Sequence, residues 1–175
     1  MYKRQALDIR PWGWDAALRK RLSGLGVDES LLPSMQQISV WREYSHRSKS
    51  VSLLPELQLD EHFCGESYYL KTPEEWKSFV EEREGCLLKA PLSGSGKGLN
   101  WCKGTFTPFI SGWCTRVAAL QGGVIAEPIY NKVEDFALEF YSDGAGEVMF
   151  AGYSLFRTGK SGMYEGNYLL SLIHI

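Results

Sequence analysis

The sequence predicts an α+β fold, and three observations in its second half indicate it. A capped amphipathic helix begins after Thr72, with a proline in the first helical position and a glutamate at the capping-box position. A second helix, with apolar residues at helical spacing, is expected over 107–120. Apolar and polar residues then alternate over 135–141, and the Asp-Gly-Ala-Gly sequence at 143–146 is typical of a hairpin turn. Helices followed by antiparallel strands are characteristic of the α+β class.

Caps, breakers and short apolar runs predict the remaining elements. Asp15 is expected to cap a short helix over 16–22, and Ser34 to cap one or two helices that reach about residue 54. Strands are expected at 65–70, 86–90, 124–130 and 147–156.

Composition excludes several classes of protein. Of 175 residues, 44% are hydrophobic and 23% are charged, which is typical of a globular protein. The net charge of −2, without a run of Lys or Arg, predicts no nucleic-acid partner, and no apolar stretch is long enough for a membrane helix. Four cysteines without a CxxC pair predict free thiols in a reducing cytoplasm and argue against zinc.

Both ends of the chain indicate sequence that is not native. Residues 2–5 can be encoded by a DNA string whose reverse complement encodes residues 170–173, and that string resembles the end of a transposase sequencing adapter. We therefore expect residues 1–5 and 170–175 to be adapter read-through. We expect the natural protein to continue beyond both ends of residues 6–169.

The most informative segment is Leu87–Gly98, where a lysine in an apolar strand precedes a loop of alternating glycines and serines. Burying Lys89 is unfavourable unless an anion meets its ammonium group. The glycines allow backbone N–H groups to turn inward around an anion, and Lys97 adds a mobile positive charge. Together they predict a cradle for a polyphosphate.

Three other phosphate motifs do not fit this segment. Pro91 and Gly98 stand where a Walker loop needs Gly and Ser or Thr, and Leu99 stands where the dinucleotide fingerprint needs Gly. Protein kinases place the glycine loop before the strand lysine, whereas Lys89 precedes it here. The alternative is a flexible hairpin whose lysine extends to solvent.

A second segment, Gly123–Phe136, has an apolar strand that ends in Glu127, followed by a short connector and further carboxylates. The connector's backbone groups fit the edge of an adenine, and Glu134 or Asp135 is placed to reach ribose hydroxyl groups. The alternative is an ordinary β-connection with solvated acids, which the segment alone favours.

In this order the two segments resemble the ATP-grasp superfamily over about residues 63–169. The resemblance implies ATP and Mg²⁺ as cofactors, with Lys89 at the α- and β-phosphates, the Gly94–Gly98 loop over the β- and γ-phosphates, and Glu127 and Tyr130 beside the adenine. The nucleotide-binding residues expected on this basis are Lys89, Ser93, Gly94, Ser95, Gly96, Lys97, Gly98, Glu127, Tyr130, Glu134 and Asp135.

Further motifs are similar to those of uncharacterised ATP-grasp proteins of gut Bacteroidales. They are Trp12–Asp15, Ser45–Arg47, Cys64–Ser67 and Glu127–Val133. The resemblance implies that 6–59 is a helical remnant of an N-terminal domain. It also implies that 60–169 is the front part of an ATP-grasp domain, truncated at both ends, which comprises a small subdomain with the Gly-rich loop and the start of an antiparallel-sheet subdomain.

The implied reaction is ATP-dependent ligation of an unidentified carboxylate to an amine or thiol through an acyl-phosphate. The alternative is a nucleotide-binding or regulatory module without chemistry, and this fragment is expected to be inactive. The catalytic residues and the oligomeric state are left open. The family's metal ligands are expected beyond the C-terminus, and the Glu165-Gly166-Asn167 spacing, Glu139 and Arg157 are only weak candidates.

Two other sites remain open. His46 precedes a basic stretch, and a surface or capping position is favoured over proton transfer. Trp12 and Trp14 are expected to pack in a core or hinge, with a substrate entrance as the alternative.

Overall fold

The computed structural model describes residues 9–168, so the two predicted adapter segments lie outside the described part. The chain divides into two compact units, Met1–Ser50 and Val51–Ile175, and each is described by itself. The domain limits predicted from the sequence stay predictions.

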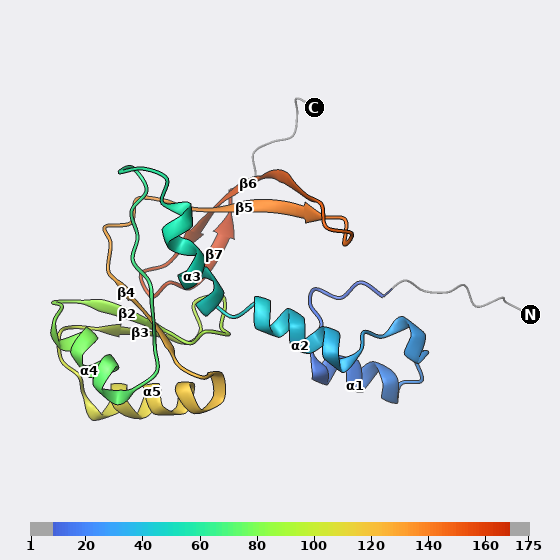
Figure 1. The fold of residues 1–175 in the computed structure, drawn as a ribbon, viewed down its shortest axis with the longest axis horizontal. Coiled ribbons are helices and arrows are strands. Elements are labelled where there is room, and N and C mark those ends of the chain that lie inside the picture. The colour runs from blue at the N-terminus through green and yellow to red at the C-terminus, as the bar shows by residue number, and fades with distance from the viewer. Residues whose placement is uncertain (1–8, 169–175) are drawn as a thin grey trace, which may run out of the picture. The chain divides into compact units, whose positions relative to one another are not determined.

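The first unit consists of short helices that are held by local caps (Figure 1). The Asp15 carboxylate accepts a hydrogen bond from the Leu18 N–H, and Ser34 caps α2, as the sequence predicts. Ser34 and Gln37 also form a reciprocal capping box. The elements are α1 (Ala16–Gly24), the 3₁₀ helix η1 (Glu29–Leu31) and α2 (Met35–Tyr44). The next helix, α3 (Ser48–Leu57), begins at the boundary between the units and includes Pro55.

The second unit contains a four-stranded sheet with strand order β1-β4-β2-β3, in which all neighbours are antiparallel. Its strands are β1 (Tyr68–Leu70), β2 (Cys86–Lys89), β3 (Leu99–Cys102) and β4 (Val124–Pro128). Helices α4 (Pro73–Glu81) and α5 (Pro108–Gln121) lie on the same side of this sheet (Figure 1). The predicted Thr72 capping box and the Thr107 cap begin these two helices.

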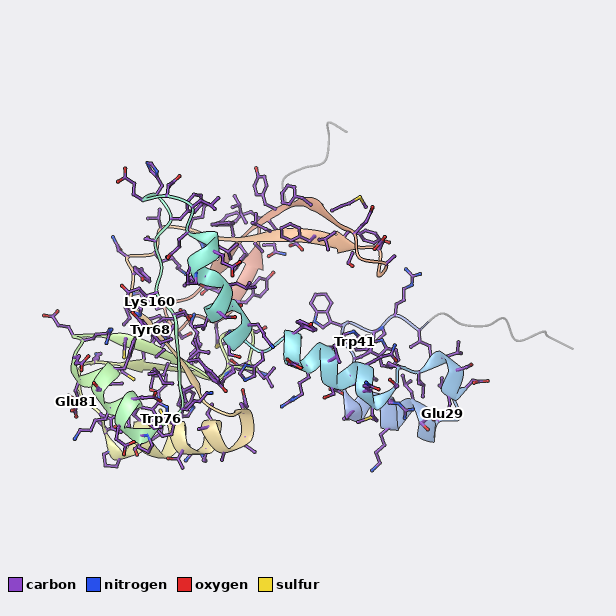
Figure 2. The ribbon with its side chains drawn as sticks, in the orientation of Figure 1. Glu29, Trp41, Tyr68, Trp76, Glu81 and Lys160 are labelled. Carbon is purple, nitrogen blue, oxygen red and sulfur yellow. The ribbon has the colours of Figure 1, made fainter. Side chains whose placement is uncertain are left out.

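The core of the second unit lies between the sheet and these helices. Trp76 on α4 is 3% exposed, and its ring nitrogen donates to the Leu70 carbonyl (Figure 2). The buried side chains that pack together are Trp76, Phe79, Val80, Cys86, Leu88, Cys102, Ile110, Cys114, Val124 and Ala126. Because this core covers one face of β2 and β4, residues that alternate with it lie on the opposite face.

A separate three-stranded sheet follows, with order β5-β6-β7. Its strands are β5 (Asp135–Ser142), β6 (Val148–Thr158) and β7 (Tyr164–Asn167), all antiparallel. The Asp143 carboxylate accepts from the Ala145 and Glu147 N–H groups, which closes the predicted hairpin turn.

The structure confirms the α+β class with antiparallel sheets and adds two strands that the sequence did not predict, β3 and β7. All four cysteines are free thiols. Within residues 9–168, every helix is too short or too polar to cross a membrane.

Candidate functional site

Lys89 lies at the end of β2, a central strand of the four-stranded sheet. Cys86 and Leu88 point into the core and are 0% exposed, so Leu87 and Lys89 occupy the other face. Lys89 is directly opposite Leu99 of β3 and Ile125 of β4. The sheet therefore fixes the lysine stem on both sides.

Glu127 on β4 meets the ammonium group of Lys89 on this face. Because Glu127 is opposite Leu87, the two charged side chains are diagonal neighbours. Lys89 Nζ lies 2.5 Å from Glu127 Oε2, and the side chains are 22% and 25% exposed. Glu127 Oε1 also accepts a hydrogen bond of 3.2 Å from Ser67 Oγ. Lys89 is thus a paired, partly buried cation, rather than the solvent-directed lysine of the alternative interpretation.

The glycine-rich loop joins β2 to β3, and its base is the Lys89–Leu99 pair. The Ala90 N–H donates to the Gly98 carbonyl at 2.8 Å, which closes the base. The Leu92 N–H donates to the Gln121 side chain at the end of α5. The loop therefore begins directly after β2, the strand that carries Lys89.

Left-handed backbone conformations shape this loop. Ser95, Gly96 and Gly98 have φ angles of 52°, 76° and 68°. A Cβ atom at Gly98 would lie 2.8 Å from Ser93 Cβ, so a side chain there would disturb the base of the loop. Left-handed residues are a component of the turns that form anion-binding nests, and in this loop the Lys97 N–H donates to the Gly94 carbonyl. Lys97 is exposed on this loop.

Tyr130 follows β4 and is tied to the segment that precedes β1. Its hydroxyl oxygen accepts a hydrogen bond of 2.8 Å from the Glu66 N–H. The Tyr68 hydroxyl donates to Glu66 Oε2, and this hydrogen bond raises the pKa of Tyr68. Through Ser67 and Glu66, this segment contacts both predicted adenine-side residues, Glu127 and Tyr130.

Sequence reasoning did not assign a role to Glu66 or Ser67. The only signal for them was the Cys64–Ser67 motif, which contributed to the family resemblance but had no function attached. Their contacts depend on the pairing of β1 with β4, which joins segments far apart in the sequence.

Glu134 and Asp135 differ in their hydrogen bonds to the described residues. Asp135 Oδ2 accepts hydrogen bonds of 2.7 Å from Lys132 Nζ and Thr158 Oγ1, and these bonds lower the pKa of Asp135. Glu134 is exposed and makes no hydrogen bond or ion pair with another residue of the described part. Both line a pocket of about 210 Å³ with Lys132, Val133, Phe156, Arg157, Thr158 and Tyr168. Of the two carboxylates, Glu134 is the one left open to a ligand.

A neighbouring pocket of about 340 Å³ contains the weak metal candidates. It is lined by Arg157, Glu165, Gly166, Asn167 and Tyr168. Glu139, the other candidate, accepts a hydrogen bond from Ser154 on the adjacent strand. Among residues 9–168, no three His, Cys, Asp or Glu side chains gather where they could hold a metal ion.

Two further candidates lie away from these groups in the chain. His46 Nδ1 lies 2.7 Å from Ser48 Oγ, next to the start of α3. Trp12 is fully exposed and Trp14 is intermediate, which is contrary to the packed core position expected for Trp12. The core position expected for Trp12 is therefore wrong, and its place at a hinge or a substrate entrance stays a prediction.

No protein-family model matches the chain, and no curated protein matches it either. The ATP-grasp resemblance therefore stays a prediction that rests on the order of the motifs.

Proposed function

We propose that the sheet face carrying Lys89 and Glu127, together with the glycine-rich loop, binds the polyphosphate of ATP. One observation carries the proposal: a partly buried lysine stands on a central strand at the base of a glycine loop, and a single carboxylate pairs with it. A buried or half-buried cation needs an anion nearby, and a phosphate meets that need as well as a carboxylate does.

The ion pair explains how this site is stable without nucleotide. Glu127 neutralises Lys89 in the free protein, and a phosphate group that approaches Lys89 takes over the same role. The exchange replaces one charge-assisted hydrogen bond by another, so the net cost of displacing Glu127 is small. Glu127 keeps the Ser67 hydroxyl as a hydrogen-bond donor when it separates from the lysine.

The loop supplies the second set of phosphate contacts in this proposal. Its left-handed residues, Ser95, Gly96 and Gly98, favour backbone N–H groups that face an anion. The exposed Lys97 adds a cation that is able to reach toward the phosphates.

The nucleoside is proposed to lie toward Tyr130 and the 210 Å³ pocket. The chain leaves β4 at Pro128, and in the connector beyond it the Lys132 N–H donates to the Tyr130 carbonyl. The other backbone groups of this connector are proposed to bind the adenine edge. Glu134 is proposed as the ribose ligand because Asp135 is already bound by Lys132 and Thr158.

Among residues 9–168, no group of three His, Cys, Asp or Glu side chains is assigned to the Mg²⁺ ion that accompanies ATP in the ATP-grasp superfamily. We therefore derive no step that involves the metal. The proposed reaction class is ligation of a carboxylate to an amine or thiol, and it rests on the motif resemblance alone. A nucleotide-binding module without chemistry remains the alternative, and assays for phosphate release separate the two.

Isothermal titration of the chain with Mg-ATP tests the proposal. Lys89→Met is expected to weaken ATP binding about tenfold or more, because it removes a charge-assisted hydrogen bond worth about 1.5–3 kcal/mol. Lys103→Met is the matched control, since Lys103 is an exposed lysine directly after β3. No binding by the wild-type chain, or equal losses in both variants, would reject the proposal.

A further inference from the structure

The glycine-rich loop contacts a second turn that comes from the other sheet. This turn, Gly159–Met163, joins β6 to β7 and is called here the β6–β7 turn. A Cβ atom at Gly96 would lie 2.6 Å from the Gly162 carbonyl oxygen and 2.6 Å from Met163 Cα. Backbone therefore packs directly on backbone, and only glycine at position 96 permits it.

Side chains of β3 contact the same turn. A Cβ atom at Gly162 would lie 2.8 Å from Leu99 Cδ1, so this glycine also lies in close contact. The Trp101 ring nitrogen donates a hydrogen bond of 3.2 Å to the Ser161 carbonyl. Since β3 is the strand to which the loop returns, strand and loop contact the turn together.

The β6–β7 turn is itself well defined by hydrogen bonds. The Gly159 N–H donates to the Met163 carbonyl at 2.8 Å, and the Gly162 N–H donates to the Gly159 carbonyl at 2.9 Å. The loop has a comparable internal bond, from the Lys97 N–H to the Gly94 carbonyl at 3.0 Å. Two hydrogen-bonded turns thus meet at a pair of glycines.

We propose that the β6–β7 turn is a seat that orders the glycine-rich loop before any ligand arrives, which makes Trp101 and Gly162 positioning residues for the loop. An ordered loop loses less conformational entropy when it binds a phosphate, so the seat raises affinity. The effect on affinity rests on the proposed function. The contact between the loop and the turn does not depend on it.

Amide hydrogen exchange of the full chain, measured by NMR without nucleotide, tests the seat. Gly96→Ala forces the loop away from the turn, and we expect exchange at both Lys97 and Gly162 to accelerate about tenfold or more as both turns open locally. Gly144→Ala is the matched control: φ is 75° at Gly144 and 76° at Gly96, but nothing lies within 4 Å of the Cβ position at Gly144. Faster exchange at Lys97 without a change at Gly162 would overturn the proposal, as would equal effects of the two variants.

A milder variant covers the case in which Gly96→Ala does not fold. Trp101→Phe removes the hydrogen bond to Ser161 and part of the ring beside Gly162, and Trp101 is 45% exposed. We expect exchange at Lys97 and Gly162 to accelerate about threefold and the free energy of global unfolding to change by less than about 1 kcal/mol. Unchanged exchange at both amides in the folded variant would overturn the proposal.

Titration with Mg-ATP then tests whether the contact with the β6–β7 turn affects nucleotide binding. Trp101→Phe is expected to weaken ATP binding about threefold, because the loop must be ordered on binding. If the wild-type chain binds no ATP while the exchange results hold, the proposed function fails and the seat stands. If ATP binds and the variant affects neither exchange nor affinity, the seat fails and the proposed function stands.

Discussion

Lys89 and Glu127 lie diagonally across β2 and β4, with their charged groups 2.5 Å apart on the sheet face away from α4 and α5. A pair in this position links two properties of the protein. It stabilises the fold by compensating a lysine in a central strand, and it leaves a cation that an incoming anion is able to share. Substitution of Glu127 separates these two roles.

The first prediction concerns Glu127→Gln. The substitution removes the carboxylate that competes with a phosphate for Lys89, so inorganic tripolyphosphate is expected to bind about fivefold more tightly, a change of about 1 kcal/mol. The free energy of unfolding is expected to fall by about 1–2 kcal/mol, because Lys89 loses its partner. Titration calorimetry and urea denaturation measure the two effects.

Glu139→Gln is the control for this change, since Glu139 lies on β5 and contacts Ser154 rather than Lys89. It is expected to leave tripolyphosphate binding unchanged. Weaker binding of tripolyphosphate by Glu127→Gln would show that Glu127 does not compete for the lysine.

The second prediction concerns the bond between Tyr130 and the segment before β1. Tyr130→Phe removes the acceptor of the Glu66 N–H, and the free energy of unfolding is expected to fall by about 0.5–1 kcal/mol. Tyr141→Phe is the control, because Tyr141 is exposed and makes no hydrogen bond with another described residue. Equal stability of both variants would mean that the hydrogen bond between the Glu66 N–H and Tyr130 does not stabilise the fold.

The third prediction is a pH dependence at Asp135. Hydrogen bonds from Lys132 and Thr158 lower the pKa of Asp135 from its ordinary value of 3.8, so the unfolded chain takes up this proton first as the pH falls. The stabilisation is complete above that ordinary value and is lost as the pH falls through the lower, folded-state pKa. Asp135→Asn should therefore be less stable than wild type by about 1 kcal/mol at about pH 7, and the difference should shrink by about pH 3.

Denaturant unfolding at both pH values measures this difference. Glu134→Gln is the control, since Glu134 is exposed and makes no such bonds within residues 9–168. A stability difference for Asp135→Asn that does not vary with pH would contradict the assignment of the bonds to the charged carboxylate.

The fourth prediction concerns thiol reactivity. Burial raises the pKa of Cys114 to about 12, and the hydrogen bond with Cys86, together with burial, raises the pKa of Cys102. Thiolate is the reactive form, so these groups are expected to be inert in the folded chain. The hydrogen bond with Cys102 lowers the pKa of Cys86, but this thiol is 0% exposed and is therefore also expected to be protected from a reagent. Only the exposed Cys64 should react rapidly with a disulfide reagent, and denaturation should release the other three. Rapid reaction of more than one thiol in the native chain would contradict the buried placement.

Local signals in the sequence predicted the helices and the hairpin well. Thr72 and Ser34 begin helices because each cap is satisfied by residues three positions away, without any help from tertiary structure. The alternation at 135–141 similarly predicted β5, since one face of this strand differs from the other in polarity.

The two unpredicted strands depend on partners that are distant or irregular. Leu99–Cys102 follows directly on the glycine loop, and its identity as a strand comes from pairing with β2. Tyr164–Asn167 pairs with β6 through a register shift between Arg157 and Thr158, which disturbs the alternation that marks a strand. Short sequence windows do not contain this information.

The sequence named the residues of the candidate site but not their contacts. The sequence indicated that Lys89 needs an anion and that Glu127 ends a strand. Which anion Lys89 meets depends on the register of β2 against β4, and that register is set by the core on the other face of the sheet. The same holds for Glu66 and Ser67, whose roles emerge only when β1 pairs with β4.

The most direct test of the account is site-resolved acylation of lysines in the wild-type chain, read by mass spectrometry with and without Mg-ATP. Nucleotide binding is expected to reduce acylation of Lys89 and Lys97 at least about threefold, because phosphate contacts cover both ammonium groups. Acylation of the exposed Lys103 should not change, and adenosine, which lacks phosphates, should protect neither lysine. Unchanged acylation of Lys89 at saturating Mg-ATP would contradict the central claim.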